Sequence, residues 1–168
     1  MGAFLILEVM RNNFERVSFC LENGANPNLG SYAHIWSALS LCQPNMEHPL
    51  RFLDLLLKNG AQLDENDALP TAAENGQTDM VNFLLDRDVK IDELGFVYCV
   101  GSGDQMDNAG SALHLAVTQG HLETATSLLD RGATIILKDE QQRTALDIAR
   151  KKGKKNIISL LQERGAAE

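Results

Sequence analysis

Residues 110–133, GSALHLAVTQGHLETATSLLDRGA, place apolar side chains at helical intervals on both sides of a central glycine. Leu113, Ala116 and Val117 recur at i, i+3 and i+4, and a second apolar series begins at Leu122. This spacing predicts two short helices, each with one apolar stripe. Because Gly120 breaks the chain between them, the stretch predicts an antiparallel helical pair.

The end of this stretch recurs along the chain. In each copy an apolar helix is followed by a polar pair, a turn residue and a small or branched residue. The copies are segments 21–28, 57–64, 85–92, 129–136 and 162–168. Their turn residues are Gly24, Gly60, Asp88, Gly132 and Gly165, which lie 36, 28, 44 and 33 residues apart. In four units an inter-helix residue precedes the turn residue by 12 positions, namely Asn12, Gly76, Gly120 and Gly153. Such internal repetition predicts a solenoid of stacked helical pairs.

The stretch 110–133 resembles an ankyrin repeat, whose helical pair carries a T-P-L-H-L-A-A…G-H-L-E-V-V…L-L…G-A pattern. The matching residues are Ser111, Leu113 to Ala116, Gly120 to Glu123, Leu128, Leu129, Gly132 and Ala133. The resemblance implies an all-α fold, an ankyrin-repeat solenoid of paired antiparallel helices with β-hairpin or loop connections. We expect one domain over 1–168, with approximate repeats 1–28, 29–64, 65–92, 93–136 and 137–168, of which the second, third and fourth are irregular.

The departures from the family period of about 33 residues are expected in loops, because an insertion inside a packed helix would rotate its apolar face away from its neighbour. About five residues are missing before Leu69, and about eleven are added after Asp88. The added segment contains the β-prone run from Phe96 to Val100, which predicts an elongated hairpin or finger near 89–110. The finger either contacts a partner or covers a groove, or it is a tolerated loop that folds back on the adjacent hairpin.

Charge and cysteine content limit the function further. The net charge of −8 argues against general nucleic-acid binding, because phosphate binding requires a cationic surface. The basic run RKKGKK at 150–155 could be a nuclear-localisation or nucleic-acid patch, or the solvated end of a terminal helix. Three cysteines without C-x-x-C spacing favour a reducing, intracellular compartment, cytoplasmic or nuclear, and predict no metal site. The apolar residues at 1–10 are too few to span a bilayer.

His114 is the histidine that a search for catalysis would find first. The resemblance implies a structural role, in which its ring ties Ser111 to neighbouring backbone. His121 is likewise expected to make a contact between linkers. We therefore predict no catalytic residue, no metal and no cofactor.

The resemblance implies a non-catalytic protein-protein interaction module that uses a concave surface of hairpin tips and first helices together with the finger. The expected partner is another protein with a basic or mixed surface, with neither nucleic acid nor membrane involved, and the chain is expected to be a monomer or a segment of a larger repeat protein. The expected contact residues are Trp36, Tyr32, His34, Glu65, Asn66, Glu74, Asn75, Phe96, Tyr98, Asp107, Asn108, Thr118, Gln119, Glu140, Gln141 and Arg143. Two alternatives remain open: a small-molecule-binding protein or enzyme with a pocket under the 93–110 insertion, and a purely structural segment of a longer array.

Overall fold

The computed structural model describes residues 5, 7–9, 11–28, 49–61, 68–96 and 109–166. It divides into two compact units, residues 1–64 and 65–168. The division falls at the boundary expected between the second and third repeats. The single domain over 1–168 stays a prediction.

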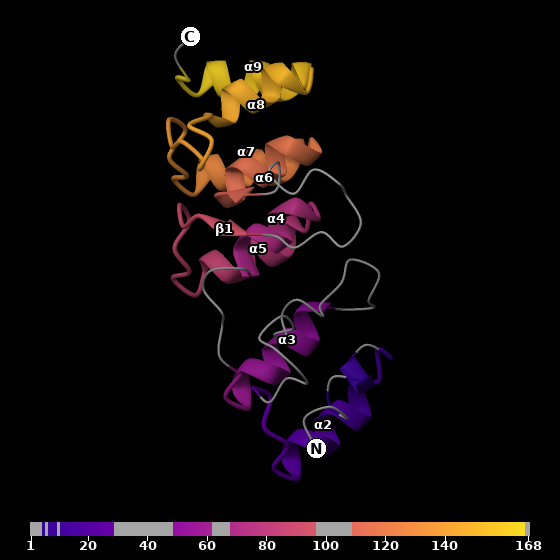
Figure 1. Ribbon diagram of the computed structural model, residues 1–168. Helices are drawn as coiled ribbons and strands as arrows, with labels where there is room; N and C mark the ends of the chain where they lie inside the picture. Colours follow the sequence, from indigo (N-terminus) through magenta and orange to yellow (C-terminus); the bar gives the residue numbers. More distant parts are fainter. Residues whose placement is uncertain are drawn as a thin grey trace. The chain divides into compact units, whose positions relative to one another are not determined.

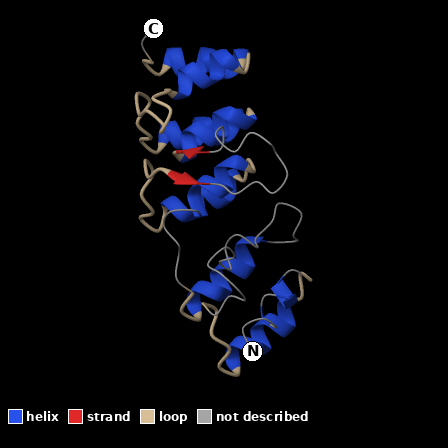
Figure 2. Cartoon of the chain, in the orientation of Figure 1, coloured by secondary structure: helices blue, strands red, loops and turns tan. Residues whose placement is uncertain are grey.

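The second unit consists of three helical pairs that are stacked one upon the other (Figure 1). Its helices are α4 (Ala68–Glu74), α5 (Thr78–Leu85), α6 (Ala112–Gln119), α7 (Leu122–Asp130), α8 (Ala145–Lys151) and α9 (Lys155–Glu163). Turns between the two helices of a pair lie along one side of the stack, and the described parts of the connections between pairs lie along the other side (Figure 2). The predicted all-α repeat fold is thereby confirmed.

The turn residues predicted from the sequence have left-handed backbone. The residues that close each pair have positive φ, with values of 81° at Gly24, 84° at Gly60, 60° at Asp88, 93° at Gly132 and 94° at Gly165. The residues between paired helices do too, at 56° for Asn12, 68° for Gly76, 95° for Gly120 and 67° for Gly153. Left-handed backbone at these points ends one helix and reverses the chain into the next.

Three helices end on an asparagine that precedes a glycine. The side-chain amides of Asn23, Asn59 and Asn75 each donate to the carbonyl four residues earlier, at 2.8, 2.8 and 2.9 Å. The following glycine N–H donates to the carbonyl three residues before it, at 3.0, 3.0 and 3.2 Å. The last turns of these helices therefore satisfy carbonyls that would otherwise lack donors.

The core of the second unit is centred on α6, which packs between α4 and α8. Every residue from Ala112 to Thr118 is buried, because neighbouring helices cover both sides of α6. Leu113 and Leu115 are fully buried, and such side chains each stabilise a fold by about 1.5–3 kcal/mol. Ala112 and Ala116, which flank these leucines in the sequence, are also fully buried and allow close helix approach.

The second helices of successive pairs are joined by a ladder of polar contacts, which we call the α5–α7–α9 ladder. Its members are the Thr78–Thr124 hydroxyl pair at 2.9 Å, Ser127 Oγ donating to Asn82 at 2.7 Å, and the ion pairs Arg131–Asp86 at 2.6 Å and Arg164–Asp130 at 2.7 Å. The two ion pairs occupy equivalent positions of successive repeats. The ladder therefore follows the repeat period.

The insertion begins and ends on a short antiparallel strand pair. β1 (Gly95–Phe96) pairs with β2 (Ala109–Gly110), with Gly95 opposite Gly110 and Phe96 opposite Ala109. The base of the predicted finger is thus a hairpin stem. Residues 97–108, which include the rest of the β-prone run, lie outside the described residues.

The first unit contains α2 (Phe14–Glu22) and α3 (Pro49–Lys58), preceded by helical residues at Leu5 and Leu7–Val9. The rings of Phe14 and Phe52 meet edge to face at 5.3 Å between centroids, and the Arg51 guanidinium lies 3.9 Å from the Phe14 centroid. These aromatic contacts join the two helices. No helix within the described ranges has the length and apolar character needed to cross a membrane.

Candidate functional site

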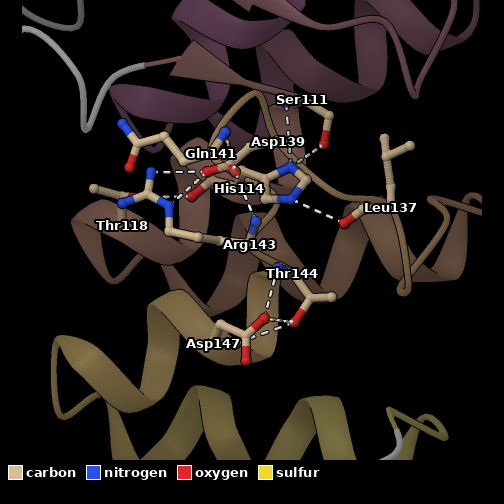
Figure 3. Close-up of polar contacts among 9 residues, drawn as sticks. All are labelled: Ser111, His114, Thr118, Leu137, Asp139, Gln141, Arg143, Thr144 and Asp147. Carbon is tan, nitrogen blue, oxygen red and sulfur yellow. Dashed lines mark hydrogen bonds and ion pairs between the residues drawn. The ribbon is translucent and has the colours of Figure 1, made fainter.

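His114 occupies the first turn of α6 and bonds on both sides of its ring (Figure 3). Nδ1 accepts from the Ser111 backbone N–H at 3.2 Å and lies 2.8 Å from the Ser111 hydroxyl. Nε2 lies 3.1 Å from the Leu137 carbonyl. Gly110 fits closely beside the ring, since a Cβ there would lie 2.8 Å from His114 Cβ. The ring therefore links the stem of the insertion to the connection between α7 and α8. This is the structural role that we predicted for His114.

These contacts require the neutral form of His114. Because a backbone N–H can only donate, Nδ1 must carry no proton, and Nε2–H must then donate to Leu137. Burial lowers the pKa of His114, while the Asp139 carboxylate and the Leu137 carbonyl oppose the shift. A neutral, buried histidine with both nitrogens engaged supports structure and is not available for proton transfer.

Asp139 holds the connection between α7 and α8 in a tight turn (Figure 3). Its carboxylate is buried and accepts from the backbone N–H groups of Gln141 and Arg143, each at 2.9 Å. The Arg143 side chain completes the set with Nε at 2.7 Å and Nη2 at 2.7 Å from Oδ2. Charge-assisted bonds of this kind are stronger than neutral ones. The turn therefore presents Glu140 and Gln141 to solvent on a fixed base.

Thr144 and Asp147 form the capping box that begins α8. Asp147 Oδ2 accepts from the Thr144 backbone N–H at 2.8 Å and from its hydroxyl at 2.7 Å. These two bonds lower the pKa of Asp147, because they favour its charged form. Asp147 has the same place in its repeat as His114, so the position caps helices and performs no common chemistry.

Two expected contact residues are not exposed. Glu74 and Thr118 each retain only 8% of their accessible surface, although the sequence placed them on the exposed side of a first helix. Gln119 Nε2 donates to Glu74 Oε1 at 3.2 Å, and Thr118 Oγ1 donates to the His114 carbonyl at 2.8 Å. We correct the expectation for both residues, because their polar groups already have partners within the fold.

Four other expected contact residues are exposed or partly exposed. Asn75 follows α4 and Gln119 ends α6, whereas Glu140 and Gln141 lie on the Asp139 turn between α7 and α8. Arg143 is half-buried against Asp139. The structure thus divides these residues between the turns within helical pairs and the connection between two pairs. For Phe96 only the backbone, in β1, is described, while Tyr32, His34, Trp36, Glu65, Asn66, Tyr98, Asp107 and Asn108 lie outside the described residues.

The turns between paired helices form a polar surface that is separate from the Asp139 turn, and we call it the turn edge. His121 Nε2 bonds to the Glu74 carbonyl at 2.9 Å, which confirms its role as a contact between linkers. In the next repeat, Lys154 Nζ donates to the Gln119 carbonyl at 3.2 Å. Sequence reasoning missed this role of Lys154 and that of Asp139. The signals were the place of Lys154 directly after an inter-helix glycine and the spacing of Asp139 four residues before Arg143.

Comparison with known proteins identifies the repeats. Residues 96–167 match the family described as "Ankyrin repeats (3 copies)". Residues 96–167 of this chain are therefore ankyrin repeats. Ankyrin repeats generally mediate protein-protein interaction and are typically non-catalytic.

Curated proteins similar to this ankyrin repeat chain are much longer than it. A transient receptor potential cation channel subfamily A member 1 homolog of Caenorhabditis elegans is 38% identical over 70% of this chain and 9% of its own length. An ankyrin repeat and KH domain-containing protein of Caenorhabditis briggsae is 35% identical over 64% of this chain and 4% of its own length. Alpha-latroinsectotoxin-Lt1a of Latrodectus tredecimguttatus is 26% identical over 55% of this chain and 6% of its own length. The chain therefore spans less than a tenth of each of these relatives.

Proposed function

We propose that this chain is a non-catalytic module that binds another protein through the connections between its helical pairs and the exposed ends of its first helices. The observation that carries the proposal is the Asp139 turn, in which a buried carboxylate fixes the backbone beneath exposed Glu140 and Gln141. A preformed loop loses little conformational entropy on binding. The turn therefore suits recognition of a protein surface.

The 97–108 insertion belongs to the same proposal. The strands that flank it, β1 and β2, form a stem that packs through Gly110 against His114. His114 in turn bonds to Leu137, two residues before Asp139. A partner that contacts both the insertion and the Asp139 turn would thus meet two segments anchored on one buried side chain. The alternative of a pocket under 93–110 falls largely on residues outside the described ranges. No observation on the described residues favours it.

Site-specific photo-crosslinking tests this proposal. A photoreactive amino acid replaces Gln141 on the Asp139 turn or, in the matched control, Gln162 on α9, since both are exposed glutamines. We expect a defined protein adduct from cells at position 141 and a weaker one or none at 162. The double variant with Glu140→Ala and Gln141→Ala should keep its helical content. Loss of binding of the crosslinked protein to this variant would support direct contact. Equal crosslinking at both positions would contradict the proposed surface.

A further inference from the structure

The helical pair that ends with α2 contains a buried carboxylate, Glu8, four residues before its inter-helix residue Asn12. Glu8 Oε1 pairs with Arg11 at 3.1 Å and with Arg16 at 3.7 Å, and the Glu8 side chain has no accessible surface. Within the described residues, Glu8 Oε2 has no hydrogen-bond partner. The three pairs of the second unit have buried alanines at the same position, namely Ala72, Ala116 and Ala149. Burial of a charge with one unsatisfied oxygen is unfavourable for the isolated pair, so the carboxylate calls for a reason beyond folding.

The residues around Glu8 occupy positions that serve stacking elsewhere in the chain. In the second unit, Gln119, Thr124 and Ser127 each bond to a residue of the preceding helical pair. Counted from the inter-helix residue, the equivalent residues of the first pair are Arg11, Arg16 and Phe19. All three are exposed. The first pair therefore presents to solvent the side on which the other pairs receive a neighbour.

An apolar side chain on this side lacks the cover that its equivalents have. Leu7 is 43% exposed, whereas Leu115 in α6 and Ile148 in α8 retain 1% and 2% of their accessible surface at the same position. Both α6 and α8 pack against a preceding first helix or its equivalent in the stack. The exposure of Leu7 is therefore what this position shows without a neighbouring pair.

Phe19 is a second apolar side chain without cover, and it is 66% exposed. Its equivalent in α5 is Phe83, whose ring centroid lies 3.4 Å from the Arg87 guanidinium carbon. Asn23 occupies the place of Arg87 in the first pair, and its amide donates to the Phe19 carbonyl at 2.8 Å. We call Leu7, Arg11, Arg16 and Phe19 the first-pair face. It combines exposed apolar area with two guanidinium groups.

The charge of the first-pair face restricts which helical pair can stack on it. In the second unit, Gln119 donates to the carboxylate of Glu74, which ends the first helix of the preceding pair, at 3.2 Å. Arg11 stands in the place of Gln119, and an arginine forms a stronger, charge-assisted contact with a carboxylate at that position. The α8–α9 pair of a second copy would present Lys151 there, and the two cations would repel one another. The face therefore suits a pair with an acidic first helix end and does not suit stacking of copies head to tail.

We propose that the first-pair face binds an ankyrin-type helical pair of a partner protein whose first helix ends on an acidic residue. Glu8 holds Arg11 and Arg16 in position for this contact, which accounts for a carboxylate where the other pairs have alanine. Leu7 and Phe19 supply the apolar area that stacking buries. The surface belongs to the first unit and makes no use of the Asp139 turn, so it goes beyond the proposed function.

A fused helical pair tests the first-pair face. The probe is a second copy of residues 65–88, which carries Glu74, joined through a second copy of the connection 133–143 to residue 3 of the chain, so that the repeat spacing is kept. Fusion raises the effective concentration of the pair and makes a weak contact measurable. Amide hydrogen exchange in α2 should be about tenfold slower in the fused chain than in the unfused one. Equal exchange in the two chains would overturn the proposal.

Two substitutions test whether the fused pair uses the proposed contacts. Phe19→Glu should leave α2 exchange of the unfused chain nearly unchanged, because the side chain is exposed, and should abolish the slowing in the fused chain. Arg11→Gln in the chain and Glu74→Gln in the probe should each reduce the slowing, and the double variant should lose less than the sum of the two. Strictly additive effects would overturn the pairing of Arg11 with an acidic helix end.

Glu8→Ala separates docking from folding. It introduces the alanine of the other pairs, so α2 of the unfused variant should exchange no faster than in the wild-type chain. In the fused variant the slowing should be smaller, because Arg11 and Arg16 lose the carboxylate that positions them. Faster exchange in the unfused variant would overturn the positioning role of Glu8, since the carboxylate would then serve the fold.

Sedimentation of the unfused chain tests the other occupant, a second copy. We expect a monomer at all concentrations. A dimer that Phe19→Glu dissociates would overturn the proposal, because the first-pair face would then be an interface between copies. Crosslinking at Gln141 does not depend on this face, so its outcome separates failure of this proposal from failure of the proposed function.

Discussion

His114 is bound by a donor on one side of its ring and an acceptor on the other, and this geometry makes its charge state part of the fold. Sequence similarity alone was enough to predict a structural role for this residue. It did not reveal Asp139, because the burial of a carboxylate in a loop depends on how the neighbouring segments fold around it. Glu74 and Thr118 were misplaced for the same reason, since a residue's exposure depends on contacts from the adjacent repeat.

The stability of the second unit should depend on pH through His114. The lowered pKa means that the unfolded chain binds more protons than the folded chain at pH values below the ordinary histidine pKa of about 6.5. The His114 contribution is therefore fully present above about pH 6.5 and is lost as pH falls toward and below its folded-state pKa. Urea unfolding at pH 7.5 and 5.0 should show a smaller pH effect in His114→Gln, which cannot titrate but can still accept from Ser111. Identical pH effects in the two proteins would contradict the prediction.

Gln142 has a φ of 59°, in the left-handed region where residues with a Cβ are disfavoured. Gln142→Gly should stabilise the fold by about 0.5–1 kcal/mol, because relief of this strain exceeds the added entropy of the unfolded chain. The neighbouring Gln141→Gly provides the control, since Gln141 does not have positive φ, and we expect it to be destabilising. Chemical unfolding midpoints of the two variants should move in opposite directions.

At the level of helices and turns, local sequence signals determined which elements could be predicted. Apolar periodicity predicted the helical pairs, and the turn residues predicted where they reverse, because both signals act within a few residues. Lys154 and the α5–α7–α9 ladder were not predicted, since their partners lie about one repeat away. The strand pair at the base of the insertion was expected only as a general hairpin, because its register depends on the positions of the two helical pairs that it joins.

The ion pairs of the ladder should contribute modestly and equally. Asp86–Arg131 and Asp130–Arg164 are largely exposed, with N–O distances of 2.6 and 2.7 Å. Exposed pairs contribute about 0.2–1 kcal/mol, and salt screens them. A double-mutant cycle with Asp86→Asn and Arg131→Gln should give a coupling energy in that range that falls in about 1 M salt. A coupling that salt leaves unchanged would show that the contact acts through packing.

At the scale of the whole chain, the division at residues 64 and 65 separates two compact units with their own cores. The second contains three complete helical pairs, whose contacts run from each pair to the next. Stability in repeat proteins is approximately a sum of repeat and nearest-neighbour terms. The second unit should therefore have enough internal interfaces to fold without the first.

A fragment of residues 65–168 should accordingly be helical and should unfold cooperatively on heating. Circular dichroism at 222 nm and amide hydrogen exchange would report this, and protection should be greatest in α6, which is buried between two neighbouring helices. The intact chain is the reference. A fragment that lacks cooperative unfolding would show that the first unit is required for the second to fold.

The asparagine-glycine steps at Asn23, Asn59 and Asn75 bear on how the protein ages chemically. Spontaneous deamidation requires the glycine nitrogen to attack the asparagine side chain, with loss of ammonia. Here that nitrogen donates to a helix carbonyl, and the side-chain amide is held by another. Mass spectrometry of stored protein should therefore find slow conversion at these steps while the helix ends are intact and rapid conversion after unfolding. The hydrogen bonds that end three helices would then also determine how fast these three asparagines deamidate.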